Sequence, residues 1–366
     1  MQRLPRPHPS VRRLPTRFLP FLLGLLALLA TLALAPRALA QRPVKPSGLT
    51  SYFSGDPVDA PVLPVGGPAL LLMGGGSEVD LAFVTRAYPI LAGGDIVVLR
   101  ASGSSGYQSY FFTDIPGQLP VADRTRLKPN SVETLVVNSR AKANLDYVRY
   151  ALDHAELIWM AGGDQNDYTT YWRGTAVETA LRAAYARGAV LGGTSAGAMV
   201  LGEYLYDPAV SAVTSAEAVA NPYRSSVTLS TDFLRLPLLY DTLVDVHFAN
   251  RDRMGRLLTF MARLRQDART SAITGLGIDE NTALFVNSLG LATFLVDGNG
   301  SGRAYVLRED RLDTIRPQVA PNLPLLYQSV RRTKLAPGQT FDFPTGVTTG
   351  VTTLLTVNGT APASPY

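Results

Sequence analysis

The chain has 366 residues, no cysteine and a formal net charge of +5. The absence of cysteine excludes disulfide bonds and thiolate metal sites, and it suits an exported bacterial protein without disulfides. Residues 1–40 hold six arginines and no acidic residue, so the rest of the chain is close to neutral, with 28 basic and 29 acidic side chains. The positive charge is therefore no argument for a nucleic-acid partner, and we expect none.

The first 40 residues have the organisation of a secretory signal peptide. Arginines between Arg3 and Arg17 precede an apolar run at residues 18–35, and Ala38-Leu39-Ala40 forms a small-residue cleavage site before Gln41. A retained membrane anchor is the alternative, because the apolar run is nearly long enough to span a bilayer. We favour cleavage, and we expect a secreted or periplasmic protein that keeps no membrane attachment afterwards.

The region after the leader predicts an α/β fold. Residues 41–66 are rich in Pro, Gly and Ser and predict a linker or an arm. Apolar strand-like runs then alternate with helical segments, which is typical of a mostly parallel sheet with helices on both faces. Strands are predicted at 68–73, 95–100, 133–138 and 155–160, and a helix that opens with a Thr175–Glu178 capping box ends at Gly188. Residues 67–310 are the predicted catalytic domain.

The last part of the chain is richer in strand signals. Residues 275–286, 292–296 and 304–307 look like strands. Residues 311–366 are rich in Pro, Thr and Gly and predict a β extension with short strands near 339–343 and 353–357, in place of an independent domain.

Three glycine clusters end predicted strands, at 74–76, 162–163 and 192–193. The strand ends of a parallel sheet lie along one edge, where ligands bind. Ordinary tight turns are the alternative for each cluster taken singly. The cluster at 74–76 is not a GxGxxG fingerprint, which argues against a nicotinamide enzyme. No cofactor and no metal site is expected.

Residues 189–197 are the most informative stretch. A short apolar strand runs into Gly193-Thr194-Ser195-Ala196-Gly197, and an Ala/Met/Leu-rich segment that predicts a helix follows. This is the strand–turn–helix context of a nucleophile elbow, in which the serine hydroxyl projects from the sheet edge. The helix start beneath it offers amide donors to an oxyanion. A purely structural turn is the alternative.

A serine nucleophile needs a base, and the chain beyond the leader has two histidines. His154 ends a predicted helix, where the helix dipole explains it. His247 follows a short β-like run and is the better candidate. Glu280 follows a strand and is the candidate to orient the imidazole, with Asp279 left open as an alternative. The order Ser, His, Glu differs from the Ser, acid, His order of α/β-hydrolases.

Three arginines follow His247, namely Arg251, Arg253 and Arg256. They are predicted at the start of a helix capped by Asn250, where cations oppose the helix dipole. A solvated basic face is one interpretation. We prefer a carboxylate clamp, because arginine binds carboxylates in a bidentate manner.

Four ordered motifs together resemble the cyanophycinases, a group within a serine peptidase family that also contains aspartyl dipeptidases. The similarity spans roughly residues 65–310, and the motifs are Gly162-Gly163-Asp164-Gln165, Gly193-Thr194-Ser195-Ala196-Gly197-Ala198, Asp245-x-His247-Phe248-x-x-Arg251-x-Arg253-x-x-Arg256 and Gly277-Ile278-Asp279-Glu280. The resemblance implies a fold like the class I glutamine amidotransferase domain. It also implies Ser195 as nucleophile, His247 as general base and acid and Glu280 as its partner, with substrate-lining roles for Gln165, Asp245 and the three arginines. Physical reasoning adds an oxyanion hole from the amides of Gly163 and Ala196.

The activity that this resemblance implies is hydrolysis of cyanophycin, a poly-aspartate that carries arginine on its β-carboxylates, to β-Asp-Arg dipeptides through an acyl-enzyme. The expected partner is thus a peptide or polymer substrate, and a homodimer is possible. Val246 departs from the pattern, because cyanophycinases usually have glutamine there. A related dipeptidase acting on other aspartyl or short peptides, and a catalytically silent binding homologue, are the alternatives.

Overall fold

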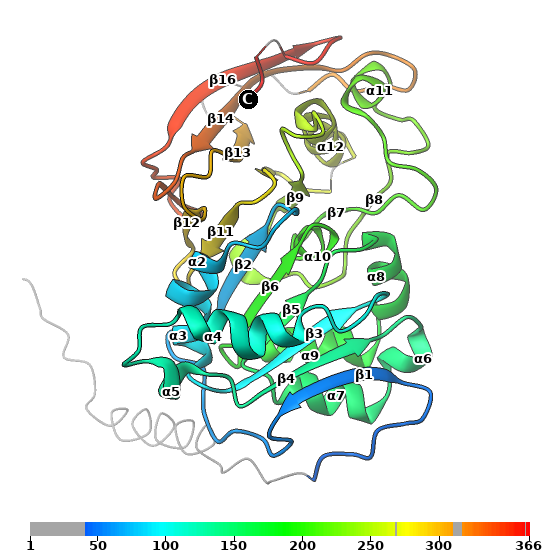
Figure 1. Cartoon of the computed structure of the whole chain (residues 1–366). Coiled ribbons are helices and arrows are strands. Elements are labelled where there is room, and N and C mark those ends of the chain that lie inside the picture. The colour runs from blue at the N-terminus through cyan, green and yellow to red at the C-terminus, as the bar shows by residue number, and fades with distance from the viewer. Residues whose placement is uncertain (1–40, 268, 310–316, 363) are drawn as a thin grey trace, which may run out of the picture. The chain divides into compact units, whose positions relative to one another are not determined.

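A nine-stranded mixed sheet forms the larger of the two main sheets (Figure 1). The computed structural model describes residues 41–267, 269–309, 317–362 and 364–366, so the predicted signal peptide at 1–40 lies outside the described residues. The centre of this sheet is parallel, in the order β4 (Ser131–Val136), β3 (Asp95–Arg100), β5 (Leu157–Met160), β6 (Val190–Thr194) and β2 (Ala69–Met73). Antiparallel strands extend both edges: β1 (Thr50–Gly55) beside β4, and β11 (Ala283–Val286), β12 (Leu291–Leu295) and β15 (Thr340–Asp342) beyond β2.

Apolar side chains alternate between the two faces of this sheet. In β2, Leu70 and Leu72 belong to one hydrophobic core and Leu71 and Met73 to another. One core is covered by α6 (Arg140–Ala143), α7 (Asp146–Asp153), α8 (Gln165–Trp172), α9 (Ala176–Ala186) and α10 (Ala196–Met199). The other is covered by α2 (Asp80–Ala82), η1 (Phe83–Ala87), α3 (Tyr88–Leu91), η2 (Tyr110–Asp114), α4 (Ile115–Gln118) and α5 (Arg124–Leu127). The predicted α/β class, a parallel sheet core with helices on both faces, is confirmed.

A second sheet of five strands is built mainly from the later part of the chain. Its order is β16 (Val351–Asn358), β14 (Leu326–Leu335), β13 (Ala304–Glu309), β10 (Thr274–Ile278) and β9 (Thr242–Val246), and only the β9–β10 pair is parallel. Two helices, α11 (Ser215–Ala220) and α12 (Met254–Gln266), add to its core. The remaining elements are a two-stranded sheet of β7 (Leu205–Tyr206) and β8 (Leu229–Ser230), and the short helix η3 (Pro237–Leu239).

Several local predictions differ from the structure. The single strand expected at 275–286 is two strands, because the turn at residues 279–282 carries the chain from the second sheet into the first. The capping box at Thr175 does not form, since its hydroxyl donates to Trp172 O and Glu178 instead accepts from Gly174 N. The Pro/Gly/Ser-rich stretch at 41–66 includes strand β1, and strand β14 was not expected.

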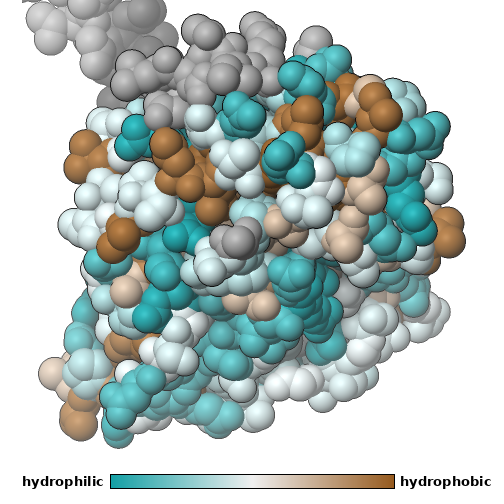
Figure 2. Space-filling model, turned by 90° about the horizontal axis from the view of Figure 1, so that it is seen from above, coloured by the Kyte–Doolittle hydropathy of each residue, from teal (hydrophilic) through white to brown (hydrophobic). Residues whose placement is uncertain are grey.

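The molecular surface is mixed in hydropathy. On the face seen in Figure 2, hydrophobic residues form small groups among hydrophilic ones. Among the residues described, no helix combines the length and the apolar character that a membrane span needs.

The strands of residues 317–366 pair into both main sheets, β15 with β12 and β14 with β13.

Candidate active site

Ser195 sits on a sharp turn between β6 and α10. Its backbone angles, φ 52° and ψ −123°, lie outside the regions that most residues adopt, and such strain concentrates at functional sites. The turn is held from below, because Ser195 N donates to Met73 O at 3.1 Å. Gly197 lets α10 approach β5 closely, since a Cβ there would collide with Met160 O. This geometry is that of a nucleophile elbow.

The second sheet supplies His247, which faces Ser195, and Glu280, which faces the other side of the His247 ring. His247 follows β9 and Glu280 follows β10, so the parallel pairing of these strands brings both residues to the same sheet edge. His247 Nε2 lies 2.7 Å from Ser195 Oγ, and His247 Nδ1 lies 2.5 Å from a Glu280 carboxylate oxygen. Three residues from distant parts of the chain thus form one continuous hydrogen-bonded line.

The chemistry of this line fixes the direction of its hydrogen bonds. An ionised carboxylate only accepts, so His247 Nδ1 carries the proton that Glu280 accepts, and Nε2 is left to accept from the serine hydroxyl. Burial lowers the pKa of His247 below its ordinary value, and the nearby cations of Arg251 and Arg253 lower it further, against the hydrogen bond with Glu280, which raises it. A neutral imidazole at neutral pH is what a general base requires.

His154 and Asp279, the two residues that the sequence also offered for these roles, do not belong to this hydrogen-bonded line. His154 precedes β5 and therefore lies at the opposite edge of the parallel strands from Ser195, with Nδ1 2.7 Å from Tyr150 O. Asp279 is buried and accepts hydrogen bonds from Ala249 N at 2.8 Å and Arg303 N at 2.9 Å, so its carboxylate does not face the imidazole.

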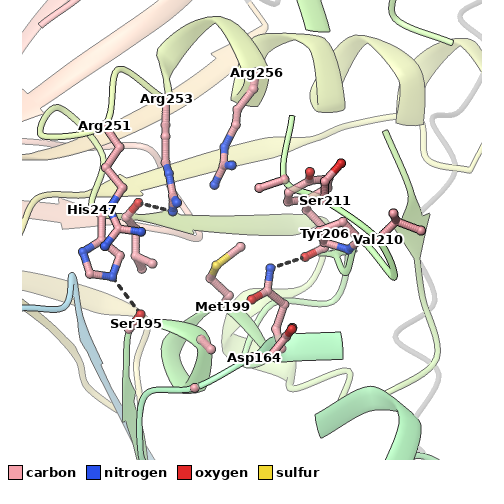
Figure 3. Close-up of a pocket in the computed structure, with 16 residues that line it drawn as sticks. Asp164, Ser195, Met199, Tyr206, Val210, Ser211, His247, Arg251, Arg253 and Arg256 are labelled. Atoms are coloured by element: carbon pink, nitrogen blue, oxygen red, sulfur yellow. Dashed lines mark hydrogen bonds between the residues drawn. The ribbon is translucent and has the colours of Figure 1, made fainter. Parts of the chain in front are cut away.

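A pocket of about 240 Å³ opens beside Ser195 and His247 (Figure 3). Gln165 enters it with its amide nitrogen 3.1 Å from Tyr206 O. Asp164 and Val246, which the sequence motifs include, also line the pocket. The sequence carries no signal for several other residues of the wall: Met199, Tyr206, Pro208, Val210, Ser211 and Ala212. Gly163 and Ala196, the expected amide donors, also line it beside Ser195.

Arg251, Arg253 and Arg256 also line the pocket, but they differ in how far other protein groups already occupy their guanidinium groups. Arg256 is buried and bidentate to Asp245, at 2.8 and 2.6 Å. Arg253 donates to Val246 O at 2.8 Å and reaches Asp245 at 3.4 Å. Arg251 is half exposed and lies 3.9 Å from Glu280. Asp245 is itself fully buried and is not part of the pocket wall, so it holds the arginines instead of facing the pocket.

The loop after His247 gives Asn250 a role other than that of a helix cap. Helix α12 begins at Met254 with Arg253 at its N-cap, so Asn250 is not the cap that the sequence suggested. Instead, Asn250 Oδ1 accepts from Glu280 N at 3.2 Å. Within the described part of the chain, histidine and acidic side chains form no group of three that could hold a metal ion.

Comparison with known proteins first finds a matching family model. Residues 126–293 match the model of peptidase family S51. All four motifs of the candidate site lie within this region, and the resemblance to the cyanophycinase-like serine peptidases is confirmed there.

Individual relatives are more specific. The chain is 36% identical over 171 residues to a cyanophycinase from Synechococcus elongatus, which covers 46% of this chain and 48% of the relative. It is 32% identical over 212 residues to a cyanophycinase from Trichormus variabilis, which covers 57% of this chain and 64% of the relative. The chain therefore matches about half the length of the first of these relatives. A solved peptidase from an acI-B1 Actinobacterium aligns with a TM-score of 0.46 at 18% identity, over 76% of this chain and 97% of that one.

Proposed function

We propose that this protein is an exported serine-type exopeptidase that hydrolyses cyanophycin to β-Asp-Arg dipeptides through an acyl-enzyme. The observation that carries the proposal is the hydrogen-bonded line of Ser195, His247 and Glu280, whose first two members line a pocket that three arginines also line. The names of the relatives supply the substrate, and the leader at 1–40 supplies the export.

In this mechanism Ser195 Oγ attacks the scissile carbonyl while His247 Nε2 takes the hydroxyl proton. Glu280 holds the imidazole in the required tautomer and stabilises its charged form. Gly163 and Ala196 both line the pocket beside Ser195, and their amides would donate to the oxyanion. His247 then returns the proton to the leaving amine, and water, activated by the same imidazole, hydrolyses the acyl-enzyme.

The substrate pocket suits a chain that bears carboxylates. Because Asp245 and Val213 O already occupy the guanidinium of Arg256, the clamp rests on Arg251 and Arg253. Both line the pocket. Val246 is fully buried where it borders the pocket and has no hydrogen-bonding group in place of the usual glutamine, so we expect looser selection of the group bound there.

The direct test uses the mature chain, insoluble cyanophycin and mass spectrometry of the released products. Wild type should release β-Asp-Arg, and Ser195→Ala should release none. Ser226→Ala is a matched control, since among the described residues its hydroxyl has no hydrogen-bond partner. Hydrolysis by Ser195→Ala at the wild-type rate would refute the assignment.

Assays on the same purified protein distinguish two other functions from the proposed one. If the protein is a dipeptidase of the same family, a panel of α-aspartyl and short peptides is cleaved and cyanophycin is not. If it is a catalytically silent binding homologue, a fluorophosphonate probe leaves Ser195 unlabelled. Analytical ultracentrifugation tests the expected homodimer independently of activity.

A further inference from the structure

Two loops that carry the histidine and the glutamate exchange hydrogen bonds through neighbouring side chains. The first loop runs from His247 to Arg253 and the second from Asp279 to Thr282. The Asn250 carboxamide accepts from Glu280 N at 3.2 Å. In the other direction, the Asp279 carboxylate accepts from Ala249 N at 2.8 Å. A side chain of each loop therefore holds a backbone N–H of the other loop, near His247 in one case and at Glu280 in the other.

The surroundings of Asp279 anchor this pair to the second sheet. Its other carboxylate oxygen accepts from Arg303 N at 2.9 Å, and its own N–H donates to Arg303 O at 3.0 Å. Burial raises the pKa of Asp279, while its two backbone donors act in the opposite direction. A buried carboxylate that receives two backbone hydrogen bonds is costly to remove, because two donors would lose their partner.

We propose that Asn250 and Asp279 are positioning residues that set the separation and angle between the His247 ring and the Glu280 carboxylate. This inference rests on the proposed function, since it assigns roles within the same site. Neither side chain lines the pocket. Their effect is exerted through Glu280 N, in the acid itself, and through Ala249 N, two residues after the base.

Substitutions at Asn250 and Asp279 are expected to differ in their effect on folding stability. Asn250 is exposed, and among the described residues its side chain makes one hydrogen bond, to Glu280 N, so Asn250→Ala should leave folding intact. Asp279→Asn keeps one acceptor oxygen but turns an amide NH₂ toward a backbone donor, and is expected to lower stability as well. Asn250 therefore offers the cleaner test, with Asp279 as support.

The experiment measures labelling of Ser195 by a fluorophosphonate across pH, a readout that needs no peptide substrate. Asn250→Ala should label about tenfold more slowly, because small displacements of catalytic groups are expensive. Its acid limb should move to lower pH, since the hydrogen bond with Glu280 raises the pKa of His247 and is loosened. With peptide substrate, kcat should fall while KM stays within about twofold, because the pocket wall is unchanged.

Two further variants test whether the effect is specific to the Asn250 acceptor. Asn250→Asp keeps the acceptor oxygen, so it should restore the labelling rate, and its added charge should move the acid limb to higher pH. Asn221→Ala removes an asparagine that accepts from Tyr223 N and Asn322 N, both at 3.1 Å, in a loop that contributes nothing to the pocket wall. It should label like wild type even if its melting temperature falls.

The outcomes are distinct. Wild-type labelling of Asn250→Ala, with an unchanged acid limb, overturns the positioning role while the proposed function stands. Absence of labelling in the wild type overturns both. Slow labelling of Asn250→Ala with recovery in Asn250→Asp supports the inference, because a general loss of folding would not recover with a charged residue.

Discussion

Gly75 offers a way to disturb the imidazole without altering any residue of the serine–histidine–glutamate line. The glycine follows β2, has a φ of +93°, and lies against the ring of His247. A Cβ at this position would lie 2.5 Å from His247 Nε2 and 2.9 Å from Nδ1. Because non-bonded heavy atoms pack comfortably at about 3.5 Å, the ring would have to retreat by about 1 Å.

We therefore expect Gly75→Ala to lower the labelling rate of Ser195 about 100-fold, the loss that a displacement of roughly 1 Å can cause. An alanine held at this positive φ also adds a strain of about 1 kcal/mol to the folded state. Stopped-time labelling with a fluorophosphonate, followed by mass spectrometry of Ser195, measures the first effect, and thermal unfolding measures the second.

Gly338→Ala is the matched control. Gly338 has a φ of +78° and no atom within 4 Å of an added Cβ, so it shares the backbone strain without the collision. We expect a similar loss of stability and wild-type labelling. If Gly75→Ala labels at the wild-type rate, the imidazole is not held where the structure puts it, and the reasoning about Ser195 and His247 is refuted.

Three further predictions follow from the same contacts. Glu280→Gln keeps the side-chain shape but can donate to Nδ1, which favours the wrong tautomer, so kcat should fall about 10³–10⁴-fold in a peptide assay. The acid limb of kcat/KM should have its midpoint below pH 6.5, because burial lowers the pKa of His247, and Arg251→Gln should move it upward by removing a cation; an unmoved limb would contradict this. Burial raises the pKa of Glu156 to about 8, so its folded form favours the proton and the unfolding free energy should decline as pH rises from about 5 to 8. Glu156→Gln should flatten that decline by up to about 1.4 kcal/mol per pH unit, which urea unfolding at both pH values measures, and an equal slope in both proteins would exclude the effect.

The sequence predicted local structure where the local signal was strong. The strand at 95–100 was predicted with its observed bounds, because five buried apolar or acidic positions stand between clear turn signals. The elbow around Ser195 was found because its glycines and its strand–helix context lie close together in the chain. His247 could be picked out because the chain beyond the leader has two histidines, and Glu280 because it follows a predicted strand.

What the sequence could not show depends on long-range pairing. Nothing in residues 275–286 reveals that the chain changes sheets between Ile278 and Ala283. The three arginines after His247 look equivalent in the sequence, yet Asp245 engages Arg256 in full and leaves Arg251 half exposed. Asn250 was assigned to a helix start because its partner, Glu280 N, lies 30 residues away.

Strand β2 supports the serine and histidine segments alike, although it precedes the region that matches the family model. Met73 O receives the N–H of Ser195, and Gly74 O receives that of His247 at 2.8 Å. A recombinant fragment cut to residues 126–293 would lack this shared support and would expose unpaired edges of β6 and β11, which invite aggregation. Anyone seeking a minimal version of this protein should begin upstream of Ala69.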